Sequence, residues 1–362
     1  MAFECWRRRG GSRRIHLKAR SIRAWLPCSP WSAVPTLTGK PWGSCTATGT
    51  VHPRMVTLFS VECGPYFDWQ TVGLMHSYRR SKQPGPITRL LSCTEKQLKD
   101  YPNMDLAPTH TVPSMSLDPK TGEWYPAINK PYGVWHWVQH SPQAQQAEWV
   151  VILDADMVIR APVTPWGVKA EKGKPVAAYY GYLIGCDNIL AELHTKHPEL
   201  CPKVGGFIVM HIDDLRRFVP LWLSKTHEVR ADKAHYARNI TGDVYSSGWI
   251  SEMYGYSFGA ADAELHHQVD QTTMLYPGYT PTPGVDPRLL HYGLAFSVGN
   301  WSFGKSQHRT DKIVNECNRL FDPPPFASEV RHSVQWGQAL KVREKVNPIG
   351  RLELRQVASL HG

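Results

Sequence analysis

Two aspartates that follow a run of apolar residues are the part of this sequence best suited to chemistry. Residues 149–153 are Trp-Val-Val-Ile-Leu, and Asp154 and Asp156 come directly after them. Such a run predicts a strand buried on both faces. If the chain stays extended, side chains two residues apart face the same side, and two carboxylates at the end of a parallel strand suit a divalent cation and a phosphate. The alternative is that both residues only begin a surface turn.

Predicted strands and helices alternate around this segment. Residues 56–61 and 87–92 predict strands, and residues 67–80 between them predict a helix, so the strands should pair in parallel. The other predicted elements are helices at 131–139, 214–224 (capped by Asp213) and 263–275, strands at 149–154, 175–180, 205–212 and 289–292, irregular structure at 94–130 and mixed structure at 225–262. This order predicts an α/β fold with a Rossmann-type mixed, mostly parallel sheet flanked by helices.

The positive charge of the chain is concentrated at its start. The net charge is +10, and residues 1–50 hold nine Lys and Arg but a single acid, Glu4. We therefore expect a disordered basic tail at 1–54, one main domain at 55–326 that is nearly neutral, and a peripheral tail at 327–362. The tail shows no clear targeting segment, and a wrongly assigned start is an alternative. No stretch reaches the roughly 18 apolar residues that a transmembrane helix needs.

The cysteines favour disulfides over a zinc site. None of the eight cysteines forms a C-x-x-C pair, which argues against structural zinc. One or two disulfides are expected in the folded part, first between Cys186 and Cys201. Sequons at 239–241 and 300–302 are compatible with the lumen of the secretory pathway.

Alternating strands and helices with Asp-x-Asp at the end of a middle strand resemble nucleotide-sugar glycosyltransferases of the GT-A type. The resemblance implies that a histidine from a late strand is the third metal ligand and that a downstream lysine contacts the diphosphate; His291 and Lys305 have this order and spacing. Two carboxylates and an imidazole suit Mn²⁺, or Mg²⁺, better than Ca²⁺. The structural alternatives are a core histidine and a solvated surface lysine.

Three runs resemble one family more closely: LFSVECGPYFDWQ at 58–70, ILDADM at 152–157 and HYGL at 291–294. They are similar to the peptidyl serine α-galactosyltransferases of plants and green algae, over about 55–326. The resemblance implies UDP-galactose as donor, serine of hydroxyproline-rich (extensin-type) proteins as acceptor, retention of configuration, and the endoplasmic reticulum or Golgi as location. The related hydroxyproline O-arabinosyltransferases carry a Glu-Pro-Asp-His type motif where this chain has Asp154 and Asp156.

Further residues are candidates for holding the substrates. Glu264, His267 and Asp270 on the predicted helix at 263–275 could hold sugar hydroxyls or steer the acceptor serine, or form an ordinary polar helix face. Gly205 and Gly206 could let the backbone approach the sugar, or form a plain tight turn.

Glu62 and Cys63 follow the first strand, where the base and ribose are expected to lie if the sheet is wound as proposed. Their place, like that of the other candidates, depends on the predicted order of strands.

Two other functions compete with this one. The chain could instead be an enzyme like the hydroxyproline O-arabinosyltransferases or one that uses another UDP-sugar, since a few pocket contacts decide donor choice. A protein of another class, a non-catalytic module whose basic tail binds nucleic acid or membrane, is supported by the tail charge alone, and the main domain holds no RNA-binding motif, so no specific nucleic-acid partner is expected. The sequence leaves the oligomeric state open.

Overall fold

The computed structural model describes residues 53–236, 248–280, 282–298 and 301–311, all within one compact unit of the chain. The predicted tail at 327–362, the tail at 1–54 except for its last two residues, the end of the main domain at 326 and the sequon at 239–241 lie outside these residues, as does Asn300 of the second sequon.

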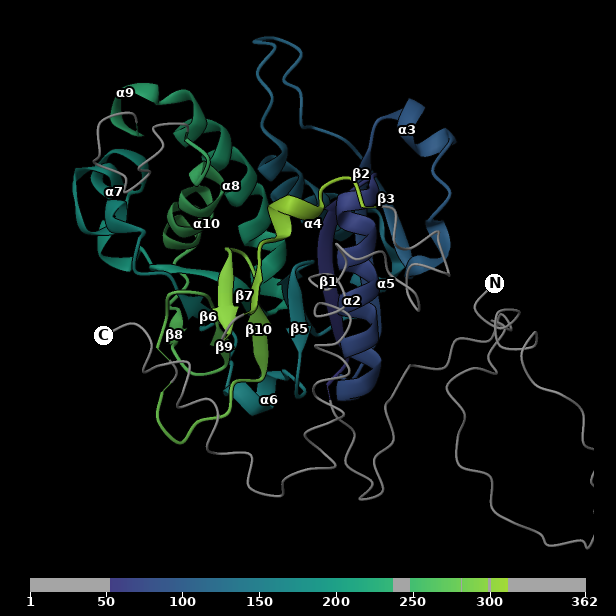
Figure 1. Cartoon of the computed structure of the whole chain (residues 1–362). Coiled ribbons are helices and arrows are strands. Elements are labelled where there is room, and N and C mark those ends of the chain that lie inside the picture. The colour runs from purple at the N-terminus through teal and green to yellow at the C-terminus, as the bar shows by residue number, and fades with distance from the viewer. Residues whose placement is uncertain (1–52, 237–247, 281, 299–300, 312–362) are drawn as a thin grey trace, which may run out of the picture. The chain divides into compact units, whose positions relative to one another are not determined.

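A seven-stranded sheet forms the centre of the described chain (Figure 1). Its strands, in spatial order, are β3 (Thr109–Pro113), β2 (Ile87–Cys93), β1 (Met55–Glu62), β4 (Trp149–Asp154), β7 (Val204–His211), β6 (Val176–Tyr179) and β8 (Gln268–Asp270). β7 runs antiparallel to both of its neighbours, whereas the other four pairings are parallel. The predicted mixed, mostly parallel sheet is confirmed. The order also reverses beside β1, because β2 follows it on one side and β4 lies on the other.

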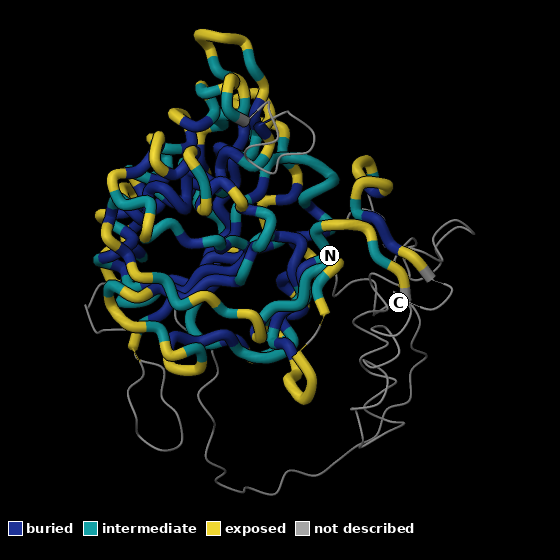
Figure 2. The backbone as a smooth tube through the Cα atoms, turned by 90° about the vertical axis from the view of Figure 1, so that its left-hand side faces the viewer, coloured by how far each residue is buried: buried dark blue, intermediate teal, exposed yellow. Residues whose placement is uncertain are grey.

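Both faces of the sheet are buried, as the apolar runs predict (Figure 2). Side chains alternate along β1 and β4, so Leu58 and Ile152 face one layer while Phe59 and Leu153 face the other. The first layer holds α4 (Asn129–His140), α8 (Ile212–Ala231) and α10 (Ser251–Asp262), and the second holds α2 (Pro65–Ser81) and a three-stranded sheet, β5 (Met157–Ile159), β10 (Leu289–His291) and β9 (Met274–Leu275).

The remaining elements are short. They are the helices α3 (Glu95–Lys99), α5 (Pro142–Gln146), α6 (Pro165–Val168), α7 (Ile189–His194) and α9 (Lys233–Tyr236), the hairpin β11 (Phe296–Val298) and β12 (Trp301–Phe303), and 3₁₀ turns at Met104–Leu106, Pro126–Ile128, Ile184–Asp187, Pro198–Leu200 and Lys305–His308. None of the helices among the described residues is long and apolar enough to cross a bilayer.

Three local predictions were wrong. Residues 94–130 are not wholly irregular, because they contain the edge strand β3. Residues 263–275 form no helix; they leave α10 and enter the short strands β8 and β9. The cap of α8 is His211, whose Nδ1 accepts from the backbone N–H of Asp213, which lies inside the helix instead of capping it.

The helix α10 lies in the segment predicted as mixed, and two glycines explain why it was missed. Glycine weakens helix propensity, but α10 crosses α8 closely: a Cβ on Gly255 would lie 2.6 Å from the backbone N of Thr226, and one on Gly259 2.9 Å from that of Trp222. The two glycines that allow α10 to pack closely against α8 are therefore the residues that made this helix hard to predict from the sequence.

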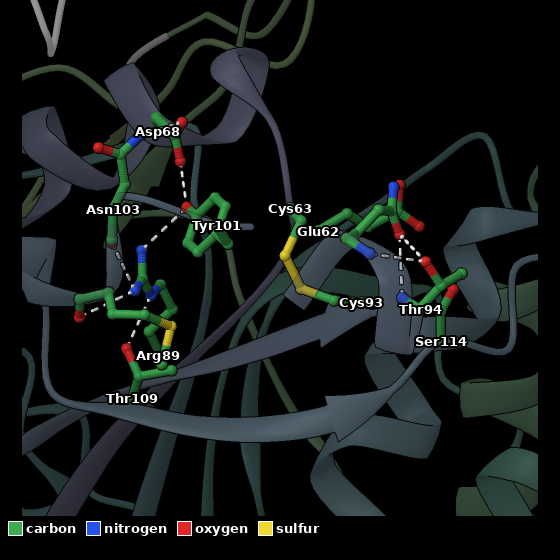
Figure 3. Close-up of a disulfide and its surroundings, with 12 residues drawn as sticks. Glu62, Cys63, Asp68, Arg89, Cys93, Thr94, Tyr101, Asn103, Thr109 and Ser114 are labelled. Atoms are coloured by element: carbon green, nitrogen blue, oxygen red, sulfur yellow. Dashed lines mark hydrogen bonds between the residues drawn. A yellow bond between two sulfur atoms is a disulfide. The ribbon is translucent and has the colours of Figure 1, made fainter. Parts of the chain in front are cut away.

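Two disulfides tie down loops of the described chain. Cys186 pairs with Cys201, as predicted, and Cys63 pairs with Cys93, joining the ends of β1 and β2 (Figure 3).

A buried polar network links β2, α2 and the loop before β3. Fully buried Arg89 donates to Thr109 Oγ1 (3.0 Å) and to the carbonyl of Asn103 (3.0 Å), while Asp68 of α2 accepts from Asn103 Nδ2 (2.7 Å) and from the Tyr101 hydroxyl (Figure 3). These bonds fix the loop before β3 against α2.

Candidate functional site

Two carboxylates and an imidazole converge beyond the end of β4. His291 Nε2 lies 3.1 Å from Asp156 Oδ1 and 3.7 Å from Asp154 Oδ2. One ligand atom from each of the three residues lies within 4.8 Å of those of the other two. Asp156 and His291 are buried and Asp154 is half-buried, so the cluster has one accessible side. The structure therefore brings together the three residues predicted as metal ligands.

The convergence comes from a turn and a long-range strand pairing. Asp154 is the last residue of β4, and a two-residue turn containing Asp156 separates it from β5, so the chain is not extended through the pair. β10 then pairs antiparallel with β5, placing His291 opposite Met157, and the backbone N–H of Tyr292 donates to the carbonyl of Asp156 (3.0 Å). The main chain of the turn is thereby fixed to the strand that carries the histidine.

A buried tyrosine orients the histidine. The hydroxyl of Tyr180, which follows β6, lies 3.1 Å from His291 Nδ1, and the ring of Tyr276 packs against the imidazole with centroids 4.9 Å apart. With Nδ1 engaged, Nε2 faces the carboxylates. This is the arrangement in which a histidine serves as a metal ligand.

Lys305 forms an ion pair with Asp156 Oδ2. Burial alone would raise the pKa of Asp156, but His291 and Lys305 hold it well below its usual range, so the carboxylate stays ionised. Burial lowers the pKa of Lys305, and the charge of Asp156 outweighs this effect and raises it. The set of two carboxylates and one imidazole fits Mn²⁺ or Mg²⁺, and the Lys305 ammonium beside it suits an anionic ligand.

A second lysine, which sequence reasoning missed, holds the other carboxylate. Lys130 Nζ lies 2.7 Å from Asp154 Oδ1, and its side chain is 16% exposed. Lys130 stands in the first turn of α4, where a cation is disfavoured by the helix dipole. The sequence gives only a weak signal for it, a cation just before the helix predicted at 131–139.

Glu62 and Cys63 lie at the end of β1, next to β4, but they differ in whether their side chains can bind a ligand. The Glu62 carboxylate accepts from Ser116 Oγ (2.6 Å) and from Asn129 Nδ2, and burial raises its pKa. The Cys63 sulfur is bonded to Cys93, so it offers no thiol to a ligand. Its backbone still lies at the edge of the sheet, and its predicted place beside the base and ribose stays a prediction.

Gly205 and Gly206 lie inside β7 and not in a turn before it. A Cβ on Gly205 would lie 2.2 Å from the Tyr180 ring, and Gly206 has a φ of +66° with its Cβ position 2.8 Å from Met274. The glycines make room for Tyr180, the residue that orients His291.

The structure does not place Glu264, His267 and Asp270 on a common helix face. His267 is bonded through Nε2 to the Tyr256 hydroxyl (2.7 Å), and burial lowers its pKa to about 3. Asp270 accepts from the backbone N–H of Thr273 (2.6 Å), closing its own turn. Glu264 is exposed with a φ of +53°. Their substrate role stays a prediction.

Known proteins resemble this chain over most of its described part. The N-terminal domain model of the hydroxyproline O-arabinosyltransferase family matches residues 56–269. Peptidyl serine alpha-galactosyltransferase of Arabidopsis thaliana is 66% identical over 285 residues, 78% of this chain and 36% of that protein. The protein of the same name from Chlamydomonas reinhardtii is 38% identical, over 80% of this chain and 41% of its own length. Hydroxyproline O-arabinosyltransferase 3 of Arabidopsis thaliana is 24% identical over 72% of this chain.

The chain spans only about two fifths of the length of the two galactosyltransferases. The family model, in contrast, covers more than half of the chain and contains β4, which ends at Asp154, and the turn that carries Asp156. This chain belongs to the hydroxyproline O-arabinosyltransferase family.

Proposed function

We propose that this chain is the donor- and metal-binding part of a glycosyltransferase that transfers galactose from UDP-galactose to serine hydroxyls of hydroxyproline-rich proteins. Asp154, Asp156 and His291 hold Mn²⁺ or Mg²⁺, and the sugar keeps its anomeric configuration. The bond from C1 of galactose to the diphosphate breaks, the bond from C1 to serine Oγ forms, and UDP and a proton are released.

One observation carries this proposal: the two carboxylates and the imidazole meet at the carboxyl end of β4, beside the point where the strand order reverses. Open α/β sheets bind their ligands at that edge. A divalent cation there supplies charge stabilisation for the leaving diphosphate. Lys305 adds a positive charge on the same side, and we assign contact with the ribose or base to Glu62 at the end of β1.

The relatives support the donor and acceptor. Two proteins named peptidyl serine alpha-galactosyltransferase are 66% and 38% identical to this chain. The family model and the relative at 24% identity favour a second candidate, arabinosyl transfer to hydroxyproline. The higher sequence identity favours galactose over arabinose as the transferred sugar, and the Asp-Ala-Asp sequence of the metal motif favours it too.

The two disulfides support a location in the lumen of the endoplasmic reticulum or Golgi. Disulfides form and persist in oxidising compartments and are rare in the cytosol. Cys63–Cys93 and Cys186–Cys201 both lie within the main domain.

A UDP-release assay tests the proposal. The chain is incubated with UDP-galactose, UDP-arabinose or UDP-glucose, a Ser-hydroxyproline peptide, and Mn²⁺ or EDTA. We expect release with UDP-galactose that needs both peptide and metal. Release with UDP-arabinose and a peptide without serine would favour the second candidate, and release that persists in EDTA would contradict the metal site.

A further inference from the structure

Two buried charged residues beside the metal ligands have no role in the function proposed above. Lys130 reaches Asp154 from α4, and Glu252 lies in the first turn of α10, buried in the same layer. The two helices cover the same face of the sheet, and both also pack against α8. Lys130 and Glu252 thus lie on the same side of Asp154, on two different helices.

The backbone around Glu252 is fixed by buried donors and acceptors. Its N–H donates to Tyr125 Oη (2.8 Å), and its carbonyl accepts from Trp222 Nε1 (3.1 Å). Such bonds hold the start of α10 in place, and the Glu252 carboxylate, which also interacts with Trp222, has further acceptor sites for another partner. Glu252 forms no ion pair within 4.0 Å with another described residue, although the charge of Lys130 is near enough to lower its pKa.

The electrostatics of the pair agree with this geometry. Burial lowers the pKa of Lys130, but the negative charges of Asp154 and Glu252 outweigh it, so the lysine stays charged. Burial raises the pKa of Glu252 to about 7, although the charge of Lys130 opposes this effect. A buried carboxyl of this kind is costly for stability and is typical of binding sites.

We propose that Lys130 and Glu252 form the subsite that grips the hydroxyl groups of the donor hexose. This inference rests on the proposed function. The hexose is bonded directly to the phosphate that the metal holds, so it must lie within one sugar ring of Asp154, and Lys130 Nζ is 2.7 Å from that carboxylate. An ammonium offers three donors and a carboxylate offers acceptors, the two functions that a pair of sugar hydroxyls requires.

Binding of the donor gives Lys130 a new partner. Asp154 shares its charge between the lysine and the proposed cation, and the ammonium can then direct its remaining N–H bonds to the sugar. This subsite is separate from the predicted sugar contacts Glu264 and Asp270, whose side chains are respectively exposed and engaged within a turn.

Calorimetric titration of the whole chain in Mn²⁺ with UDP and with UDP-galactose tests the subsite. For Lys130→Met and Glu252→Gln, we expect the Kd of UDP-galactose to rise about 10- to 100-fold, as for a lost hydrogen bond to a charged group. The Kd of UDP should change little, or fall for Lys130→Met, because the lysine repels the cation. The preference for UDP-galactose over UDP-glucose should shrink in both variants.

Matched controls are Lys174→Met and Glu171→Gln, which remove the same charges from an exposed pair (2.8 Å) on the surface. Both should bind like the wild type. If Lys130→Met does not fold, the near-isosteric Glu252→Gln still carries the test.

Equal losses for UDP and UDP-galactose would mean a structural role and overturn the subsite, as would unchanged binding of both. A wild-type chain that binds neither nucleotide in Mn²⁺ would overturn the proposed function and the subsite together.

Discussion

Tyr180→Phe should weaken metal binding although tyrosine 180 touches no metal-binding atom. Its hydroxyl lies 3.1 Å from His291 Nδ1, and the residue is 2% exposed. If Nε2 binds the metal, the imidazole proton is on Nδ1 and is donated to the tyrosine oxygen. Phenylalanine leaves that N–H buried without an acceptor, which costs about 1–3 kcal/mol.

This cost translates into affinity, because the ring can turn only by losing the metal contact. We expect the Kd of Mn²⁺, measured by electron paramagnetic resonance in the presence of UDP, to rise about 10- to 100-fold. Tyr256→Phe is the matched control: it also removes a buried hydroxyl bonded to an imidazole, Nε2 of His267 (2.7 Å). Unchanged Mn²⁺ affinity in Tyr180→Phe, or equal loss in the control, would refute the reasoning.

Three further predictions concern packing, pH and the disulfide. Gly205→Ala places a methyl group 2.2 Å from the Tyr180 ring, so Mn²⁺ affinity should fall and urea denaturation should show a loss of about 1–3 kcal/mol; unchanged values would contradict this. Burial raises the pKa of Glu252 to about 7, above its unfolded value, so its contribution to stability is complete below about pH 4.5 and is lost as the pH rises through 7. Over this pH range the unfolding free energy of the wild type should fall by roughly 3 kcal/mol more than that of Glu252→Gln. An equal fall in the two proteins would contradict this prediction. Replacing Cys63 and Cys93 by serine opens a loop with a sequence separation of 30, which should cost about 3–4 kcal/mol in denaturant titrations, a loss that an unmoved midpoint would exclude.

The fold was predictable where local pattern and burial agree. The runs that became β1, β2, β4 and β7 are apolar and buried on both faces, so periodicity and length identified them. The helix at 263–275 was wrong because polar residues at helical spacing there belong to short strands and turns. α10 was hidden because its glycines serve packing against α8, a requirement that only the tertiary structure reveals.

The site was predictable in its residue types and not in its connections. Asp154, Asp156 and His291 were expected together by resemblance, but their contact depends on the pairing of β5 with β10, more than 130 residues apart. Lys130 left only the weak signal of a cation at a helix start. The buried position of Glu252 follows from α10 and could not be predicted without that helix.

The most direct test of the account is a crystal of the chain soaked with Mn²⁺ and UDP and measured at the manganese absorption edge. The account predicts one anomalous peak in contact with Asp154, Asp156 and His291 and with both phosphates of UDP, with Lys305 moved from Asp156 to the diphosphate. UDP bound at the sheet edge without a peak there, or a peak held by other residues, would contradict it.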